Sequence, residues 1–234
     1  MSSESFAPFS LMHAVVVAVL SVLTLAVVGS SRRLDTAQRN RRRLRLGLAM
    51  LGVQVIYQFY WLVVRSGSGE SLPLHLCDVA GAAAVLAFLL PIRLFRSLLY
   101  FWGIGLSSLA FIIPVLEEGP VSPAFWLFWL SHWVIVGGAV YLVAVDGFRP
   151  RWRDLWTAVA VMLGYGIVTV FLNKAWGSNY MYTGDHPMPT PGSFEVAWPF
   201  PRLVVFGAAA ALLMLAAHLP WVRSENRTSL GGGR

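Results

Sequence analysis

The chain has few charged residues and almost no cysteine. Charged residues make up 12% of its 234 residues and hydrophobic residues 57%, whereas a soluble domain carries about 25% charged residues. An ordinary soluble domain is therefore excluded, and the composition indicates a membrane protein. The single cysteine excludes an intramolecular disulfide. The sequence also lacks an internal repeat, a paired Cys/His zinc spacing and a nucleic-acid-binding motif, so we expect no metal, cofactor or nucleic acid.

Seven apolar runs, separated by polar or proline-rich breaks, dominate the sequence. About 20 apolar residues suffice to cross a bilayer as a helix. The runs predict an all-α, polytopic bundle of seven transmembrane helices in one domain, residues 1–222. Six crossings are the main alternative, because the fourth run follows the third so closely that only a tight turn fits between them. The predicted spans are residues 9–29, 46–64, 74–92, 94–114, 124–145, 155–172 and 203–219.

The basic residues predict the orientation in the membrane, since cytoplasmic loops keep an excess of Lys and Arg. The stretch "RRLDTAQRNRRRLR" contains seven arginines and joins the first two runs. With this loop in the cytoplasm, alternating connections leave only Arg65, Lys174 and Arg202 outside. We therefore expect a multi-pass protein of the cell membrane, with an outer N-terminus that is retained and a cytoplasmic C-terminus with a flexible tail at 223–234. The loop should contact anionic lipid.

A cluster of reactive side chains lies where the third run begins, in "LPLHLCD". Cys77 follows His75 by two residues and precedes Asp78 directly, and Pro73 suits a first helical turn. Cys77, Gly81 and Ala84 fall at i, i+4 and i+7, so the thiol shares a helix face with small residues. His75 and Asp78 are three residues apart and could hydrogen-bond each other. A lone cysteine in a span is usually a small core residue, so only its surroundings would make it reactive.

A histidine lies at a similar depth in the fifth run, in "FWLFWLSHWVIVGG". An ionisable residue inside a span is costly unless it is paired or hydrated, which makes His132 a functional candidate. The alternative is a structural histidine bound to a carbonyl on a neighbouring helix. An imidazole near Cys77 could accept the thiol proton and generate the thiolate required for acyl transfer.

The long outer connection at 173–201 contains five of the 13 prolines together with aromatic residues. Connections of this length are often lids or binding loops. Supporting or substrate-binding candidates here lie above the same outer mouth as Cys77 and His132; they are Asn173, Asn179, Tyr180 and Tyr182. Asn179 or a backbone amide is a candidate to stabilise an oxyanion.

The motifs "LPLHLCD", "SHW" and "NYMY…P…G…WP" resemble the YwaF-type bacterial integral membrane proteins. That family is related to a eukaryotic transmembrane acyltransferase that makes polyunsaturated ether phospholipids, the transmembrane protein 164 family. The resemblance implies a multi-helix membrane fold, with Cys77 at the nucleophile position and His132 at the position of the catalytic histidine. Asp78 stands where the eukaryotic relatives have a histidine directly after the cysteine.

Three functions are compatible with this sequence. The first is a membrane enzyme that transfers or hydrolyses acyl groups of a phospholipid or other acyl donor in the outer half of the bilayer, with Cys77 as nucleophile and His132 as base. The second is a transporter or small-molecule-binding membrane protein without catalysis, although the repeated halves common in transporters are absent. The third is a structural subunit in which Cys77 is replaceable.

Overall fold

Seven α-helices and two short 3₁₀ helices make up the part of the chain that the structure describes, and no strand occurs there. The computed structural model describes residues 5–66, 71–184 and 202–231. The predicted all-α fold is therefore confirmed. In chain order the elements are α1 (Leu11–Arg32), α2 (Thr36–Val64), α3 (Leu76–Leu89), α4 (Arg93–Gly105), η1 (Ser107–Phe111), α5 (Pro123–Ala144), α6 (Trp152–Trp176), η2 (Tyr180–Tyr182) and α7 (Arg202–Gly231).

Six segments are long and apolar enough to cross a membrane: α1, α2, α4 continued by η1, α5, α6 and α7. All seven predicted runs form helices, but α3 has only 14 residues. Its length is about 21 Å, shorter than the roughly 30 Å of bilayer hydrocarbon. The protein is thus a multi-pass helical bundle with six long apolar helices and one short one.

The start of α3 differs from the expectation based on Pro73, whereas its end follows from the sequence. The helix begins at Leu76, so Pro73 lies before the first turn instead of inside it. Its end is set by Pro91, which disfavours helical geometry in the residue before it. That residue, Leu90, is extended with φ −116° and ψ 135°. The tight turn predicted between the third and fourth runs is therefore present, and α4 begins at Arg93.

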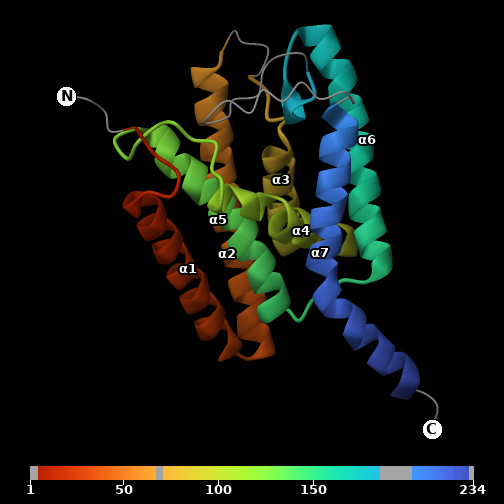
Figure 1. Cartoon of the computed structure of the whole chain (residues 1–234). Coiled ribbons are helices and arrows are strands. Elements are labelled where there is room, and N and C mark those ends of the chain that lie inside the picture. The colour runs from red at the N-terminus through yellow and green to blue at the C-terminus, as the bar shows by residue number, and fades with distance from the viewer. Residues whose placement is uncertain (1–4, 67–70, 185–201, 232–234) are drawn as a thin grey trace.

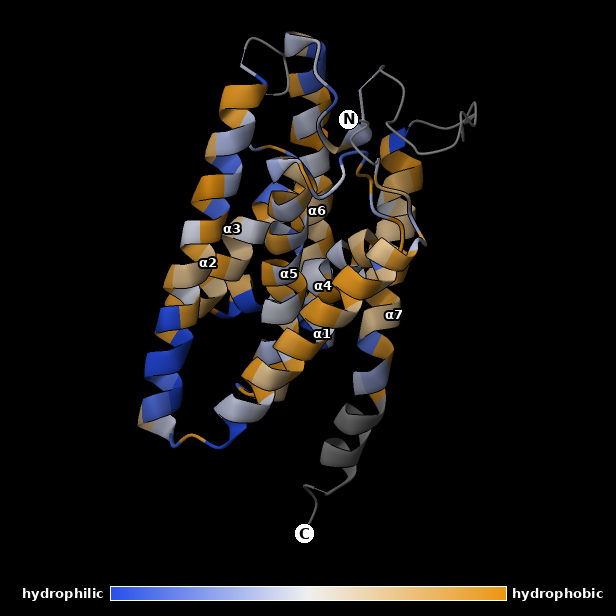
Figure 2. Cartoon of the chain, turned by 90° about the vertical axis from the view of Figure 1, so that its left-hand side faces the viewer, coloured by the Kyte–Doolittle hydropathy of each residue, from blue (hydrophilic) through white to orange (hydrophobic). Residues whose placement is uncertain are grey.

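The centre of the bundle is α4, which packs against α3, α5, α6 and α7 (Figure 1). Its side chains Leu99, Phe101 and Trp102 are almost completely buried in the main core, together with Phe88 of α3. The outer helices α1 and α7 show hydrophobic surface, whereas the start of α2 is hydrophilic (Figure 2). The apolar surface of α1 and α7 suits a lipid environment.

Ion pairs connect the helices at the arginine-rich end. Arg93 of α4 donates to both carboxylate oxygens of Asp154 in α6, at 2.9 and 2.6 Å. Arg96 of α4 and Arg43 of α2 both approach Asp146, at 2.9 and 3.8 Å. These pairs fix the α3–α4 turn against the α5–α6 connection.

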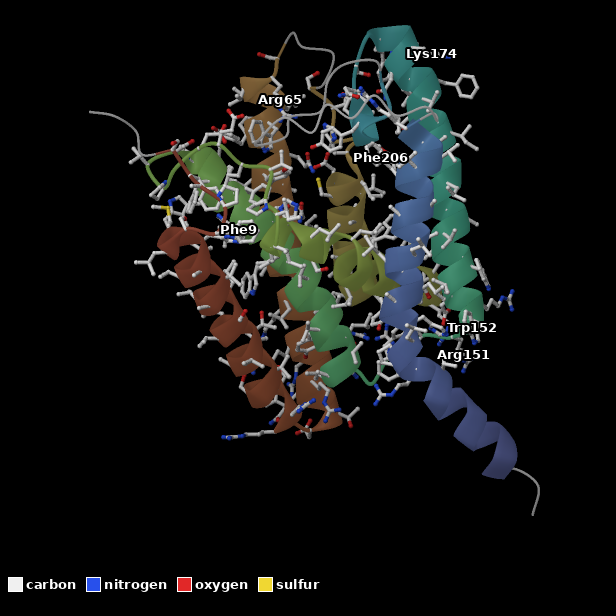
Figure 3. All side chains as sticks on the ribbon, in the orientation of Figure 1. Phe9, Arg65, Arg151, Trp152, Lys174 and Phe206 are labelled. Carbon is white, nitrogen blue, oxygen red and sulfur yellow. The ribbon has the colours of Figure 1, made fainter. Side chains whose placement is uncertain are left out.

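Basic residues also mark the two ends of the bundle. Figure 3 shows Arg65 and Lys174 at the end opposite Arg151. The assignment of these ends to the outside and the cytoplasm stays a prediction. The predicted outer connection overlaps α6, which continues to Trp176, while residues 185–201 lie outside the described residues. Residues 223–231 of the predicted tail belong to α7, and 232–234 also lie outside the described part.

Candidate functional site

The carboxylate of Asp78 fixes the start of α3. Its Oδ2 accepts a hydrogen bond from the His75 backbone N–H at 2.9 Å. Its Oδ1 accepts one from Nε2 of Gln58, in α2, at 3.0 Å. His75 and Asp78 are therefore hydrogen-bonded, through the backbone of His75. Asp78 stabilises the first turn as an acidic residue at the positive end of the helix dipole.

Cys77 is the second residue of α3 and is partly buried. Tyr165 of α6 lies beside the entry to this helix. The Tyr165 hydroxyl donates to the Leu74 carbonyl at 2.7 Å, which attaches the entry to α3 to α6. The residues on either side of Cys77 are thus held by two neighbouring helices, through Gln58 of α2 and Tyr165 of α6.

A hydrogen-bonded amide lies one turn further along α3. A Cβ at Gly81 would stand 2.6 Å from Cδ of Gln54, so the side chain of Gln54 packs directly on the glycine. Nε2 of Gln54 donates to the Ser131 carbonyl at 3.5 Å, and its Oε1 accepts from the Ser131 hydroxyl at 3.3 Å. The predicted face of small residues on α3 therefore meets α2. Gln54 in turn connects α3 to the segment of α5 that carries His132.

His132 is buried in α5, with 6% of its surface exposed. Its Nδ1 lies 2.8 Å from the Phe128 carbonyl oxygen, and its ring packs on Phe128 at 4.3 Å between centroids. Because a carbonyl only accepts, Nδ1 carries the proton and Nε2 of the neutral ring keeps its lone pair. This is the tautomer that a base at Nε2 requires. No hydrogen bond joins His132 to Cys77 in the described residues, so their direct pairing stays a prediction.

The connection after α6 folds over the start of α3. Asn173, in the last turn of α6, accepts from the Tyr180 N–H at 2.8 Å and donates to its carbonyl at 2.9 Å. The ring of His75 lies 5.4 Å from that of Tyr180 and 5.5 Å from that of Tyr182. Oδ1 of Asn179 accepts from Gly184 N–H at 2.9 Å and closes the turn. These predicted supporting residues are thus brought together with His75.

Comparison with protein families identifies the family of this chain. The model of the TMEM164 family matches residues 4–219. The chain belongs to the TMEM164 family. No curated protein and no solved structure matches it. The narrower YwaF-type assignment stays a prediction.

For this TMEM164-family protein, the match and the six long apolar helices establish a multi-pass integral membrane protein. In the described residues, no group of three or more His, Cys, Asp or Glu side chains could hold a metal ion. The polar groups around α3 are instead placed for hydrogen bonding.

Sequence reasoning missed Gln54, Gln58 and Ser131, which connect α2 to α3 and α5. The signal was available, because amides within an apolar run are costly unless they find partners. Their partners could not be identified, since hydropathy alone does not tell which face of α2 meets which helix.

Proposed function

We propose that this protein is a membrane lipid-modifying enzyme of the TMEM164 family, which transfers or hydrolyses acyl groups in the outer half of the bilayer. Cys77 is the nucleophile and His132 the base. The observation that carries the proposal is the 2.8 Å separation of His132 Nδ1 from the Phe128 carbonyl oxygen, from which we infer that Nδ1 donates and that Nε2 retains the lone pair. The side chain of Gln54 supports the proposal. It packs on Gly81 of α3, the helix that carries the thiol, and is hydrogen-bonded to Ser131 of α5, the residue before His132.

The proposed reaction has two steps. Nε2 of His132 takes the thiol proton, and the sulfur attacks the ester carbonyl carbon, so that a tetrahedral oxyanion forms. The carbon–oxygen bond then breaks, the imidazolium returns its proton to the leaving alcohol, and a thioester remains on Cys77. Attack by an acceptor alcohol completes a transfer, and attack by water completes a hydrolysis.

The supporting residues have distinct roles in this proposal. Asp78 and Gln58 position the turn that carries Cys77. His75, Tyr180 and Tyr182 form an aromatic group above the start of α3. Asn173 and Asn179 hold the turn that bears the two tyrosines, so each acts through the position of its neighbours.

Thioester trapping tests the proposal directly, because Cys77 is the only cysteine in the chain. The purified protein is incubated with a phospholipid that bears an alkyne-tagged acyl chain, and the labelled protein is then treated with neutral hydroxylamine. We expect hydroxylamine-sensitive label on the wild type and none on Cys77→Ala. His132→Ala should lower the rate of labelling about 100-fold or more, the typical contribution of a general base.

Two outcomes would contradict the proposal. Equal labelling of the wild type and Cys77→Ala would exclude the thiol as nucleophile. No labelling of any variant by a panel of diacyl and ether phospholipids would favour the solute-binding alternative. The control is Ser108→Ala, which removes a hydroxyl of η1 that donates to the Ile104 carbonyl at the end of α4 and should label as the wild type does.

A further inference from the structure

A groove lies along the arginine-rich first turns of α2. Its volume is about 590 Å³. One part of its lining is polar and cationic and consists of Gln38, Arg41, Arg42 and Arg45. The other part is apolar and consists of Leu34, Leu46 and Ala49. We call this the arginine groove.

The arginines of the groove have no carboxylate partner in the described part of the chain. The ion pairs there use Arg43, Arg93 and Arg96, which face Asp146 and Asp154. The remaining nearby carboxylate, Asp35, accepts from the backbone N–H of Gln38 at 2.8 Å and caps α2. Within α2, Arg43 is thus paired with Asp146 and Arg39 donates to the Leu34 carbonyl, whereas the arginines of the groove have no compensating carboxylate among the described residues.

The position of the groove along α2 matches the edge of a bilayer. The helix has 29 residues and is about 44 Å long, whereas the hydrocarbon core is about 30 Å thick. Its apolar run begins at Leu46, directly after Arg45. Figure 2 shows this change from hydrophilic to hydrophobic residues along α2. Arg41 and Arg42 therefore lie about one turn beyond the hydrocarbon, at the depth of lipid phosphates.

We propose that the arginine groove binds one anionic glycerophospholipid. Its phosphate lies among the guanidinium groups of Arg41, Arg42 and Arg45, whose planar forks match phosphate oxygens. The first methylenes of an acyl chain lie on Leu46 and Ala49. This site is separate from Cys77 and goes beyond the proposed function. It also differs from a general attraction of basic loops to anionic membranes, because it requires the apolar floor as well as the charge.

Lipid binding to the purified protein in a neutral detergent tests the site. Native mass spectrometry measures the retention of dioleoyl-phosphatidylglycerol against dioleoyl-phosphatidylcholine. We expect one phosphatidylglycerol per chain and no comparable binding of phosphatidylcholine. The triple variant Arg41→Gln, Arg42→Gln, Arg45→Gln should weaken the binding on the order of 100-fold, since each arginine near a lipid surface contributes about fivefold.

A matched control removes the same charge from the same end of the molecule. The variant Arg33→Gln, Arg151→Gln, Arg153→Gln changes three exposed arginines that do not line the groove. It should weaken binding less than about threefold, because exposed charges at a distance are screened. Equal weakening by both triple variants would overturn the proposal and indicate a diffuse charge effect.

A second variant tests the apolar floor with every arginine retained. Ala49→Trp fills the floor with a bulky side chain at an exposed position, so the bundle should fold normally. We expect binding about tenfold weaker, because the acyl chain loses its apolar contact. Unchanged binding by Ala49→Trp would overturn the lipid site. Displacement of the lipid by millimolar glycerol 3-phosphate would also overturn the proposal, since such competition would indicate a site for a free anion.

Discussion

Gly81 provides the sharpest test of how α3 is held against α2. A methyl group added here would lie 2.6 Å from Cδ and 2.7 Å from both polar atoms of the Gln54 amide. These separations are far below van der Waals contact, so Gln54 must move. Its amide is held on the other side by three hydrogen bonds with Ser131, two donated by Nε2 and one accepted by Oε1. We therefore expect Gly81→Ala to break the contact between α2 and α5 as well.

The expected effect of Gly81→Ala on stability follows from one favourable and two unfavourable contributions. Replacement of glycine by alanine inside a helix gains about 1 kcal/mol in helix propensity. Overpacking costs about 1–3 kcal/mol, and each lost hydrogen bond costs about 1 kcal/mol. With all three hydrogen bonds to Ser131 lost, the net result is a loss of about 3–5 kcal/mol in the free energy of unfolding. Reversible unfolding in mixed micelles, followed by tryptophan fluorescence, measures it.

A double-mutant cycle separates this mechanism from a general intolerance of α3. In a Gln54→Ala background the amide is absent, so Gly81→Ala should be neutral or stabilise by up to about 1 kcal/mol. The matched control is Gly52→Ala in α2, where an added Cβ meets nothing within 4 Å. The reasoning is wrong if Gly81→Ala costs the same in both backgrounds, or if it is as harmless as Gly52→Ala.

Three further predictions follow from the fold. Asp154→Asn should lower the free energy of unfolding by about 1–3 kcal/mol, because it removes the negative charge of a bidentate salt bridge with Arg93; a thermal melt unchanged from wild type would contradict this. Asp78→Asn should cost about 1–2 kcal/mol by losing one acceptor, and Gln58→Glu in the same chain should restore part of it, since the donor and acceptor are exchanged; no recovery in the double variant would refute this pairing. In a Cys77→Ala background, an impermeant maleimide should label Lys174→Cys in intact cells and Arg151→Cys only after permeabilisation; the reverse pattern would invert the topology.

Much of the fold could be read from the sequence because membrane helices need long apolar runs. All seven predicted runs are helical, and Pro91 ends the third one. The position of Cys77 at the start of a helix was also predictable, since Asp78 is well placed as an acidic residue in a first turn. These features depend on local sequence alone.

The contacts between helices could not be predicted in the same way. A lipid-facing side and a protein-facing side of a helix are equally apolar, so hydropathy does not fix the rotation of α2. Gln54 and Gln58 give α2 a polar face. No neighbouring sequence feature indicates that Gln54 binds Ser131 or that Gln58 binds Asp78. The short length of α3 was missed because three non-helical residues after it, Leu90, Pro91 and Ile92, are as apolar as the helix itself, so the apolar run 74–92 is longer than the helix Leu76–Leu89.

The short α3 and the turn that covers it belong to one arrangement. In Figure 1, α3 begins below the ends of α2 and α6. The space above it is occupied by Tyr180, which is fully buried and accepts from the Leu72 N–H at 3.1 Å. Directly after Tyr180 the backbone turns through two left-handed residues, Met181 (φ 54°) and Tyr182 (φ 57°). Each costs about 1–2 kcal/mol, and such strain persists only where the surroundings hold it. The two hydrogen bonds between Asn173 and the Tyr180 backbone, with the burial of the Tyr180 ring, are the interactions that hold it.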